Sequence, residues 1–156
     1  MMLNTSFRIV QSREDAEDIM QESFLVAFEK IGQLKESVSL GGWLKRIVIN
    51  RSLDAVRKKK RDGWTEVLND SIQQEEDDVQ EEDLSATIEQ IKEGIYNLKE
   101  KYRIVLVLNL IEGYNLKEIA SFLKLKESTV RNQFSRGKKQ LILKLKRHHH
   151  EFREAH

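Results

Sequence analysis

The 156-residue sequence contains no cysteine and no proline. Without cysteine the chain can form no disulfide, no thiolate nucleophile and no zinc site built on cysteine. Without proline, and with only 7 glycines, long uninterrupted helices are favoured, because both residue types interrupt helices. Long hydrophobic runs are missing as well. The longest apolar stretch, residues 104–111, is interrupted by Asn109 and is far shorter than the ~20 residues of a membrane span.

Several functional classes lack their usual signals. The N-terminus has no basic start, long apolar run or small-residue cleavage site, so we expect a cytoplasmic protein without membrane insertion. The sequence has no glycine-rich phosphate loop, and its histidines lie only at the extreme C-terminus, at positions 148–150 and 156. Three adjacent histidines without a carboxylate or cysteine set are a poor metal site. We therefore predict no enzyme, no cofactor, no metal and no small-molecule substrate.

Charge is abundant but segregated, so the net charge of +1 conceals three blocks. Residues 43–61 carry eight basic side chains and one acidic one, and residues 113–147 carry ten basic and two acidic. Between these blocks, seven of the nine residues 75–83 are acidic. This distribution predicts two polyanion-binding units joined by a self-repelling linker.

Helical periodicity predicts the organisation of the first unit. Residues 14–31 form an amphipathic pattern whose apolar members are Ala16, Ile19, Met20, Phe24, Ala27, Phe28 and Ile31. Gly32 is a plausible helix end, and a polar loop over 33–39 leads to a second helix. The expected buried residues of the second helix are Leu44, Ile47, Val48, Ala55 and Val56. Its opposite side carries Arg46, Asn50, Asp54, Arg57 and Arg61.

The second unit has the pattern of a helix-turn-helix. Its first seam comprises Leu84, Ile88, Ile91, Ile95 and Leu98, and residues 102–111 are apolar enough for a central buried helix that Gly113 ends. Asn115 and Glu118 form a capping box for a helix over 116–123. That helix is expected to bury Ile119, Ala120 and Leu123. After a turn at 124–126, a basic helix over 128–147 is expected to direct inward Val130, Phe134, Gly137, Leu141 and Leu145.

These patterns predict an all-α protein with two small helical domains joined by an acidic linker. The first domain spans 1–61, the flexible linker 62–83, the helix-turn-helix domain 84–147 and a solvated tail 148–156. The composition supports folded domains, because 39% of the residues are hydrophobic.

The last helix has the composition of a recognition helix. Its outward side carries donors and acceptors that can reach base edges and phosphates, namely Ser128, Arg131, Asn132, Ser135, Arg136 and Lys139. A solvated basic face of an ordinary helical hairpin is the alternative, and Ala120 favours the helix-turn-helix because it allows close helix contact. We expect Asn132, Ser135 and Arg136 to select sequence. Lys138, Lys144 and Lys146 would mainly supply the electrostatic field.

Two surfaces of the first unit admit two interpretations each. The helix bearing Arg46, Asn50 and Arg51 ends in the basic run 57–61 and begins with Trp43, an arrangement that suits single-stranded DNA. Trp43 could equally pack in the core, and a basic run is often only a solvated helix end. Residues on the outer face of the first helix form either a solvated face or a protein-docking face anchored by Leu25. These residues are Asp15, Asp18, Gln21, Glu22, Leu25 and Glu29.

Three segments resemble a known family. Residues 13–25, REDAEDIMQESFL, closely resemble the region 2 signature of extracytoplasmic-function (ECF) sigma factors, and residues 43–54, WLKRIVINRSLD, resemble the next part of that region. The segments that resemble region 4 are Tyr102-Arg103 with Leu106, EGYNLKEIA at 112–120, and Thr129-Val130-Arg131 with Arg136. The matches occur in the family's order on both sides of an unmatched linker.

The resemblance implies a bacterial RNA polymerase sigma factor. Asp18, Gln21, Glu22 and Leu25 would dock on the β′ clamp helices, and the second domain would meet the β flap. The loop over 33–42 would hold a flipped base of the promoter −10 element. DNA-binding residues in the first domain would be Trp43, Arg46, Asn50, Arg51 and Arg57. Arg131, Asn132, Ser135 and Arg136 would meet the −35 element, with Ser128 and Lys139 beside them.

Other interpretations remain at the level of sequence. A helix-turn-helix transcriptional regulator acting without a sigma role is the alternative, although it would leave the docking face and the first basic helix unused. A purely structural helical protein would not need a recognition-like helix. The resemblance leaves open an anti-sigma factor as a further partner, beside core RNA polymerase and promoter DNA.

The sequence also departs from the family pattern. Such proteins usually have about one more helix before Arg13, whereas this sequence has only a dozen residues there, which leaves open whether the first domain lacks its first helix. Proline is common where Lys99 stands, glycine where Lys124 stands and a serine cap where Lys126 stands. Each change is expected to weaken a local boundary by ~1 kcal/mol or less.

Overall fold

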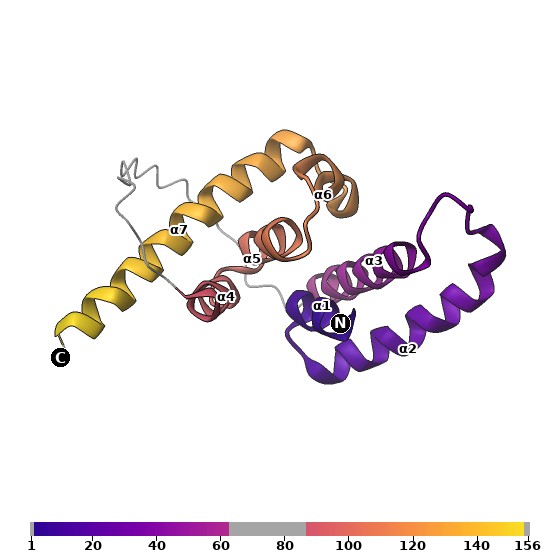
Figure 1. The fold of residues 1–156 in the computed structure, drawn as a ribbon, viewed down its shortest axis with the longest axis horizontal. Helices are drawn as coiled ribbons and strands as arrows, with labels where there is room; N and C mark the ends of the chain where they lie inside the picture. Colours follow the sequence, from indigo (N-terminus) through magenta and orange to yellow (C-terminus); the bar gives the residue numbers. More distant parts are fainter. Residues whose placement is uncertain (1, 63–86, 155–156) are drawn as a thin grey trace. The chain divides into compact units, whose positions relative to one another are not determined.

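The computed structural model describes residues 2–62 and 87–154, with side chains up to residue 147 (Figure 1). The chain divides into two compact units, Met1–Leu68 and Asn69–His156, and each is described by itself. Within the described ranges the regular structure is helical and contains no strand, which confirms the predicted all-α class. The predicted linker falls almost entirely outside these ranges. No described helix is long and apolar enough to cross a membrane.

The first unit begins with a helix that the periodicity analysis did not predict. Helix α1 (Met2–Val10) packs against α2 (Arg13–Lys30) and α3 (Leu40–Arg61). Its buried residues are Thr5, Ser6 and Ile9, and two of these are polar. The Ser6 and Ser52 hydroxyls lie 2.8 Å apart inside the unit, which satisfies both groups in the core. The described chain therefore has one helix, α1, before Arg13.

Helix α2 buries a narrower stripe than the sequence predicted. Ser12 caps its start by accepting a hydrogen bond from the Asp15 backbone N–H at 3.2 Å. The buried residues are Ala16, Ile19, Ser23 and Ala27. The predicted burial of Phe24, Phe28 and Ile31 is wrong, since they are 54%, 83% and 51% exposed. Small buried side chains let the neighbouring helices approach α2 closely, which leaves no room for the two phenylalanines on that stripe.

A short 3-10 helix, η1 (Ile31–Gln33), and a loop connect α2 to α3. The Ser39 side chain caps α3 by accepting from the Gly42 N–H at 3.1 Å. The buried residues of α3 are Val48, Ile49, Ser52, Leu53 and Val56. Val48 and Val56 were predicted, whereas Leu44, Ile47 and Ala55 are only half-buried. The core side of α3 is therefore rotated slightly from the predicted one.

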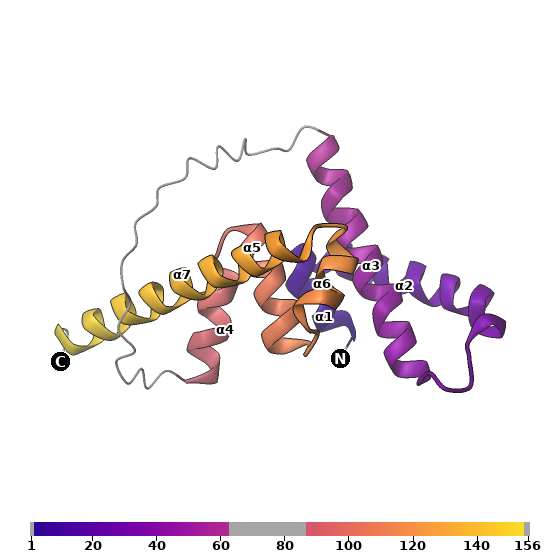
Figure 2. The same ribbon diagram turned by 90° about the horizontal axis from the view of Figure 1, so that it is seen from above.

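The second unit comprises α4 (Ile88–Tyr96), α5 (Glu100–Leu106), a π-helical turn η2 (Val107–Ile111), α6 (Leu116–Leu123) and α7 (Glu127–Glu154). Helix α7 packs across α4 and α5, as both views show (Figures 1 and 2). The predicted central buried helix is confirmed over residues 102–108, although it relaxes into the π turn. Ile88 is exposed, and Leu84 lies outside the described residues. Residues 148–154 continue α7, so the predicted tail is helical over most of its length.

The helix-turn-helix forms as predicted. The Asn115 side chain accepts from the Glu118 N–H at 2.9 Å and the Glu118 carboxylate accepts from the Asn115 N–H at 3.0 Å, which completes the capping box. Lys124 ends α6 in the left-handed region with φ 55°. In α6 the buried aromatic is Phe122, whereas Leu123, predicted to be buried, is only half-buried.

Candidate nucleic-acid interface

The predicted DNA-contacting residues of α7 lie together on its surface. The structure exposes all six of them, namely Ser128, Arg131, Asn132, Ser135, Arg136 and Lys139. The buried positions Val130, Gly137 and Leu141 occupy the other side of the helix and pack on the unit's core. Arg131 forms an exposed ion pair of 2.9 Å with Glu127, one turn earlier. The helix thus offers a row of polar and cationic side chains, as a recognition helix does.

Glycine 137 sets how closely this helix approaches α5. A Cβ at this position would lie 3.1 Å from the Tyr102 Cβ and 3.4 Å from a Leu106 side-chain carbon, so a larger residue would push the helices apart. The contact brings the start of α5 beside the recognition helix, where Lys101 and Tyr102 line a pocket with α7. Sequence periodicity did not single out Lys101, because only the tertiary contact places it at this surface.

The basic surface of the first unit lies on α3. Arg46 and Asn50 are exposed, while Trp43, Arg51 and Arg57 are half-buried. Trp43 is therefore neither buried in the core nor fully exposed for stacking on a DNA base. Arg57 pairs with Asp54 at 2.8 Å on the same helix.

The outer face of α2 carries the predicted docking residues. Asp18, Gln21, Glu22 and Leu25 are all exposed, and Leu25 retains 67% of its surface. Phe24 and Phe28 add exposed apolar surface to this helix, a feature that the sequence analysis missed because it assigned both to the core.

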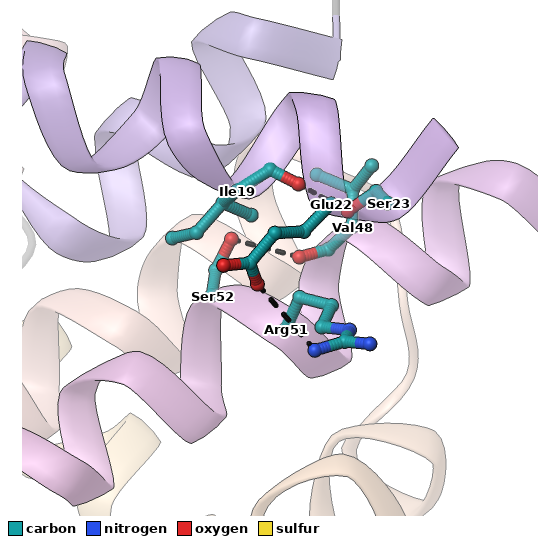
Figure 3. A network of polar contacts seen from close by, with 6 residues as sticks. All are labelled: Ile19, Glu22, Ser23, Val48, Arg51 and Ser52. Atoms are coloured by element: carbon teal, nitrogen blue, oxygen red, sulfur yellow. Dashed lines mark hydrogen bonds and ion pairs between the residues drawn. The ribbon is translucent and has the colours of Figure 1, made fainter. Parts of the chain in front are cut away.

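An ion pair connects this face of α2 to the basic helix. The Arg51 guanidinium donates to the Glu22 carboxylate at 3.4 Å across the two helices (Figure 3). Beside the pair, the buried Ser23 and Ser52 hydroxyls donate to the carbonyls of Ile19 and Val48, at 2.6 and 2.8 Å (Figure 3). A residue assigned to partner docking and one assigned to DNA are thus in direct contact.

Among the residues that the structure describes, two ionisable groups have shifted pKa values. The hydrogen bond from Lys59 is the main reason that the pKa of Asp15 lies below its usual value, with the Ser12 hydroxyl contributing in the same direction. This bond ties the start of α2 to the end of α3. Burial lowers the pKa of Arg103, an effect that the nearby Glu100 charge opposes. Arg103 is 6% exposed, so this part of the region 4 motif serves the core.

The described residues hold no group of three or more histidine, aspartate or glutamate side chains that could bind a metal ion. What they offer instead is two basic helical surfaces, one in a helix-turn-helix. Fold and surfaces together define a two-domain helical DNA-binding protein.

Comparisons with known proteins identify the family. Sigma-70 region 2 matches residues 1–62, and Sigma-70, region 4 matches residues 88–141. The ECF RNA polymerase sigma factor SigW of Bacillus subtilis is 33% identical over 150 residues, covering 90% of this chain and 80% of SigW. SigE of Mycolicibacterium smegmatis, also an ECF sigma factor, is 31% identical over 146 residues, covering 92% of this chain and 56% of SigE. The chain belongs to the ECF family of RNA polymerase sigma factors.

A solved structure agrees on the fold. The sigma factor RpoE of Bartonella quintana, crystallised with the anti-sigma factor NepR, superposes with a TM-score of 0.61 at 20% identity, covering 93% of this chain and 89% of RpoE. The match to region 2 also disfavours a regulator acting without a sigma role, because such a regulator needs only the helix-turn-helix.

Proposed function

We propose that this sigma factor divides promoter recognition between its units, with α3 of the first unit on the −10 element and α7 of the second on the −35 element. Each unit presents one basic helical surface, as two separate DNA contacts require. The observation that carries the proposal is the exposure of all six polar and cationic residues on α7 opposite its buried face. Promoter sequence would be read there through base edges in the major groove.

The outer face of α2 would dock on the β′ clamp helices of core polymerase. An apolar side chain within a polar rim is the usual composition of an energetic anchor, and Leu25 stands beside Asp18, Gln21 and Glu22 in this way. The second unit would meet the β flap. An anti-sigma factor is a further proposed partner, by analogy with the RpoE complex.

The loop between α2 and α3 would hold a flipped base of the −10 element. This part of the chain comprises residues 33–39 and the first residues of α3. Extruding a base costs a few kcal/mol, which binding energy can supply without hydrolysis. The protein would accordingly act without catalysis or a cofactor, in the cytoplasm where RNA polymerase works.

Charge reversal on α2 tests the docking surface. Asp18→Lys should weaken binding to core polymerase, because it places a cation within the anionic face, while leaving helicity unchanged. Glu17→Lys is the matched control, since Glu17 is exposed on the same helix about 100° around its axis. Binding can be measured by titrating labelled protein with core enzyme. Equal losses for both variants, or none for Asp18→Lys, would remove the docking assignment.

A further inference from the structure

A side-chain hydrogen bond connects the central helix of the second unit to the start of the helix-turn-helix. The Asn109 side-chain amide, in the π turn η2, donates to the Tyr114 carbonyl at 2.8 Å. We infer that Asn109 is a positioning residue for promoter recognition, because this bond fixes the direction of α6 and, through α6, the start of the recognition helix α7. The inference rests on the proposed function, since it takes α7 as the helix that reads the −35 element.

The connection between the π turn and α6 has little conformational freedom. Each of the backbone N–H groups of residues 112–114 donates to a carbonyl of residues 107–109, at 3.0–3.2 Å. Gly113 has a φ of 80°, the left-handed conformation in which a chain commonly leaves a helix. The carbonyl of Tyr114 then accepts from the Asn109 side chain. Backbone and side chain of the π turn thus hold the connection together, and π turns are frequent at functional sites.

The segment that Asn109 holds is attached to α6 at two places. Tyr114 directly precedes Asn115, whose side chain forms the capping box with Glu118 at the start of α6. The Tyr114 ring also meets the Phe122 ring edge-on, with 5.0 Å between the ring centroids, and Phe122 is buried near the end of α6. Because α6 packs against η2, the bond from Asn109 constrains the direction of the whole helix relative to the π turn.

The start of α7 depends on α6 for its position. Only a short turn separates the two helices, since α6 ends at Leu123 and α7 begins at Glu127. Within this turn the Leu125 N–H donates to the Ala120 carbonyl at 3.1 Å. Val130, in the first turns of α7, is fully buried, and α7 packs against α6. A tilt of α6 would accordingly move the end of α7 that carries the residues proposed to read bases.

Base readout is sensitive to such a tilt. Hydrogen bonds to base edges need donor–acceptor distances of about 2.7–3.2 Å, and a binding site must hold its groups within about 0.5 Å and about 10–20°. One bidentate contact to a base contributes ~5-fold to ~150-fold discrimination against the wrong base. Contacts to phosphate carry no sequence information. A small change in the direction of α7 should therefore reduce discrimination between DNA sequences more than it reduces affinity for DNA in general.

The ratio of affinities for two DNAs tests the positioning role. Wild-type holoenzyme would first select its promoters from a random-sequence library, and binding would then be measured on selected and scrambled upstream elements. Asn109→Leu removes the donor and keeps the size of the side chain, so the ratio should fall by at least about threefold, part of the value of one base contact. A merely structural role would lower both affinities by the same factor and leave the ratio unchanged.

Ile95→Val is the matched control for stability. Ile95 is 1% exposed in the core of the second unit, and the loss of one buried methylene destabilises about as much as the loss of one hydrogen bond. The affinity ratio of this variant should equal that of the wild type. Asn109→Asp keeps the shape of the side chain but has no donor at neutral pH, so it should lower the ratio as Asn109→Leu does. It serves as the second variant if Asn109→Leu does not fold.

Residual dipolar couplings of the full chain measure the direction of α6 without DNA. Asn109→Leu should change the couplings of α6 relative to those of α5, whereas Ile95→Val should leave them unchanged. An unchanged direction of α6, or an affinity ratio no lower than that of Ile95→Val, overturns the positioning role. Failure of the wild-type holoenzyme to select any upstream element overturns the proposed function instead, and the couplings still decide whether Asn109 fixes α6.

Discussion

Three arginines assigned to DNA each have a carboxylate partner within the free protein. Arg51 pairs with Glu22, Arg57 with Asp54 and Arg131 with Glu127. The pairs are substantially solvent-exposed, and exposed ion pairs contribute only about 0 to 1 kcal/mol to stability. Exchanging such a carboxylate for a DNA phosphate should therefore cost the fold little. We expect the pairs to weaken non-specific DNA binding slightly, because each cation must first leave its carboxylate partner.

The Glu22–Arg51 pair offers a test of whether a carboxylate partner weakens DNA binding by an arginine. Glu22→Gln should strengthen binding of the free chain to a single-stranded oligonucleotide, by up to about fivefold, because it releases Arg51 from a pair worth at most ~1 kcal/mol. In an Arg51→Gln background the same change should have little effect. Fluorescence anisotropy at low salt would measure both. An equal gain in oligonucleotide affinity in the two backgrounds would mean that the change in net charge causes it, and not the release of Arg51.

The Asp15–Lys59 bond predicts a pH dependence of the first unit. Because the folded-state pKa of Asp15 is lowered below 3.8, the bond stabilises the fold above that pH, and the stabilisation is lost as pH falls through the folded pKa. Asp15→Asn should thus flatten the fall in unfolding free energy between about pH 6 and about pH 3. Urea titrations over this range would measure it. Lys59→Gln should flatten this fall in the same way. If the unfolding free energy of the double variant fell more steeply with decreasing pH than that of either single variant, another group would be responsible.

At the scale of elements, α1 completes the core of the first unit. Ile9 is fully buried there, whereas Phe7 on the same helix is 42% exposed. Ile9→Ala should lower the unfolding free energy by about 2–5 kcal/mol, the usual cost of a large cavity. Phe7→Ala should cost clearly less. Hydrogen exchange of α2 and α3 would show the difference, and unchanged protection in Ile9→Ala would mean that α1 packs only loosely.

The turn of the helix-turn-helix contains a strained lysine. Lys124 adopts φ 55°, a region that disfavours side chains with a Cβ, and glycine is the residue suited to this position. Lys124→Gly should raise the unfolding free energy of the second unit by ~1 kcal/mol. Lys124→Ala removes the same charge and keeps the Cβ, so it should not stabilise. Thermal denaturation of both variants would decide, and equal stabilities would exclude backbone strain as the cause.

The sequence predicted the elements that have local signals. Asn115 and Glu118 marked the start of α6, and Gly113 and the apolar run before it marked the central helix. Helix α1 was missed although its sequence is amphipathic, and the pairing of its buried Ser6 with Ser52 depends on a tertiary contact that the sequence does not show. Phe24 and Phe28 were misassigned because helical spacing alone does not distinguish a core phenylalanine from an exposed one.

At the scale of the whole molecule, the charge segregation is explained by the sigma role. Two blocks with local excesses of basic residues fall in regions 2 and 4, and the acidic residues 75–83 fall between the matched regions. A net charge near zero thus coexists with two basic blocks in the sequence. Nucleic-acid affinity would follow the local fields and not the net charge.

Initiation by a reconstituted holoenzyme is the decisive test of the sigma role. Purified chain would be mixed with bacterial core RNA polymerase and a library of promoter templates, and transcript start sites would be mapped with and without the chain. The account predicts new start sites downstream of a two-part element, lost when either part is scrambled and lost with the Asp18→Lys variant. Transcripts identical to those of core enzyme alone, across the whole library, would contradict it.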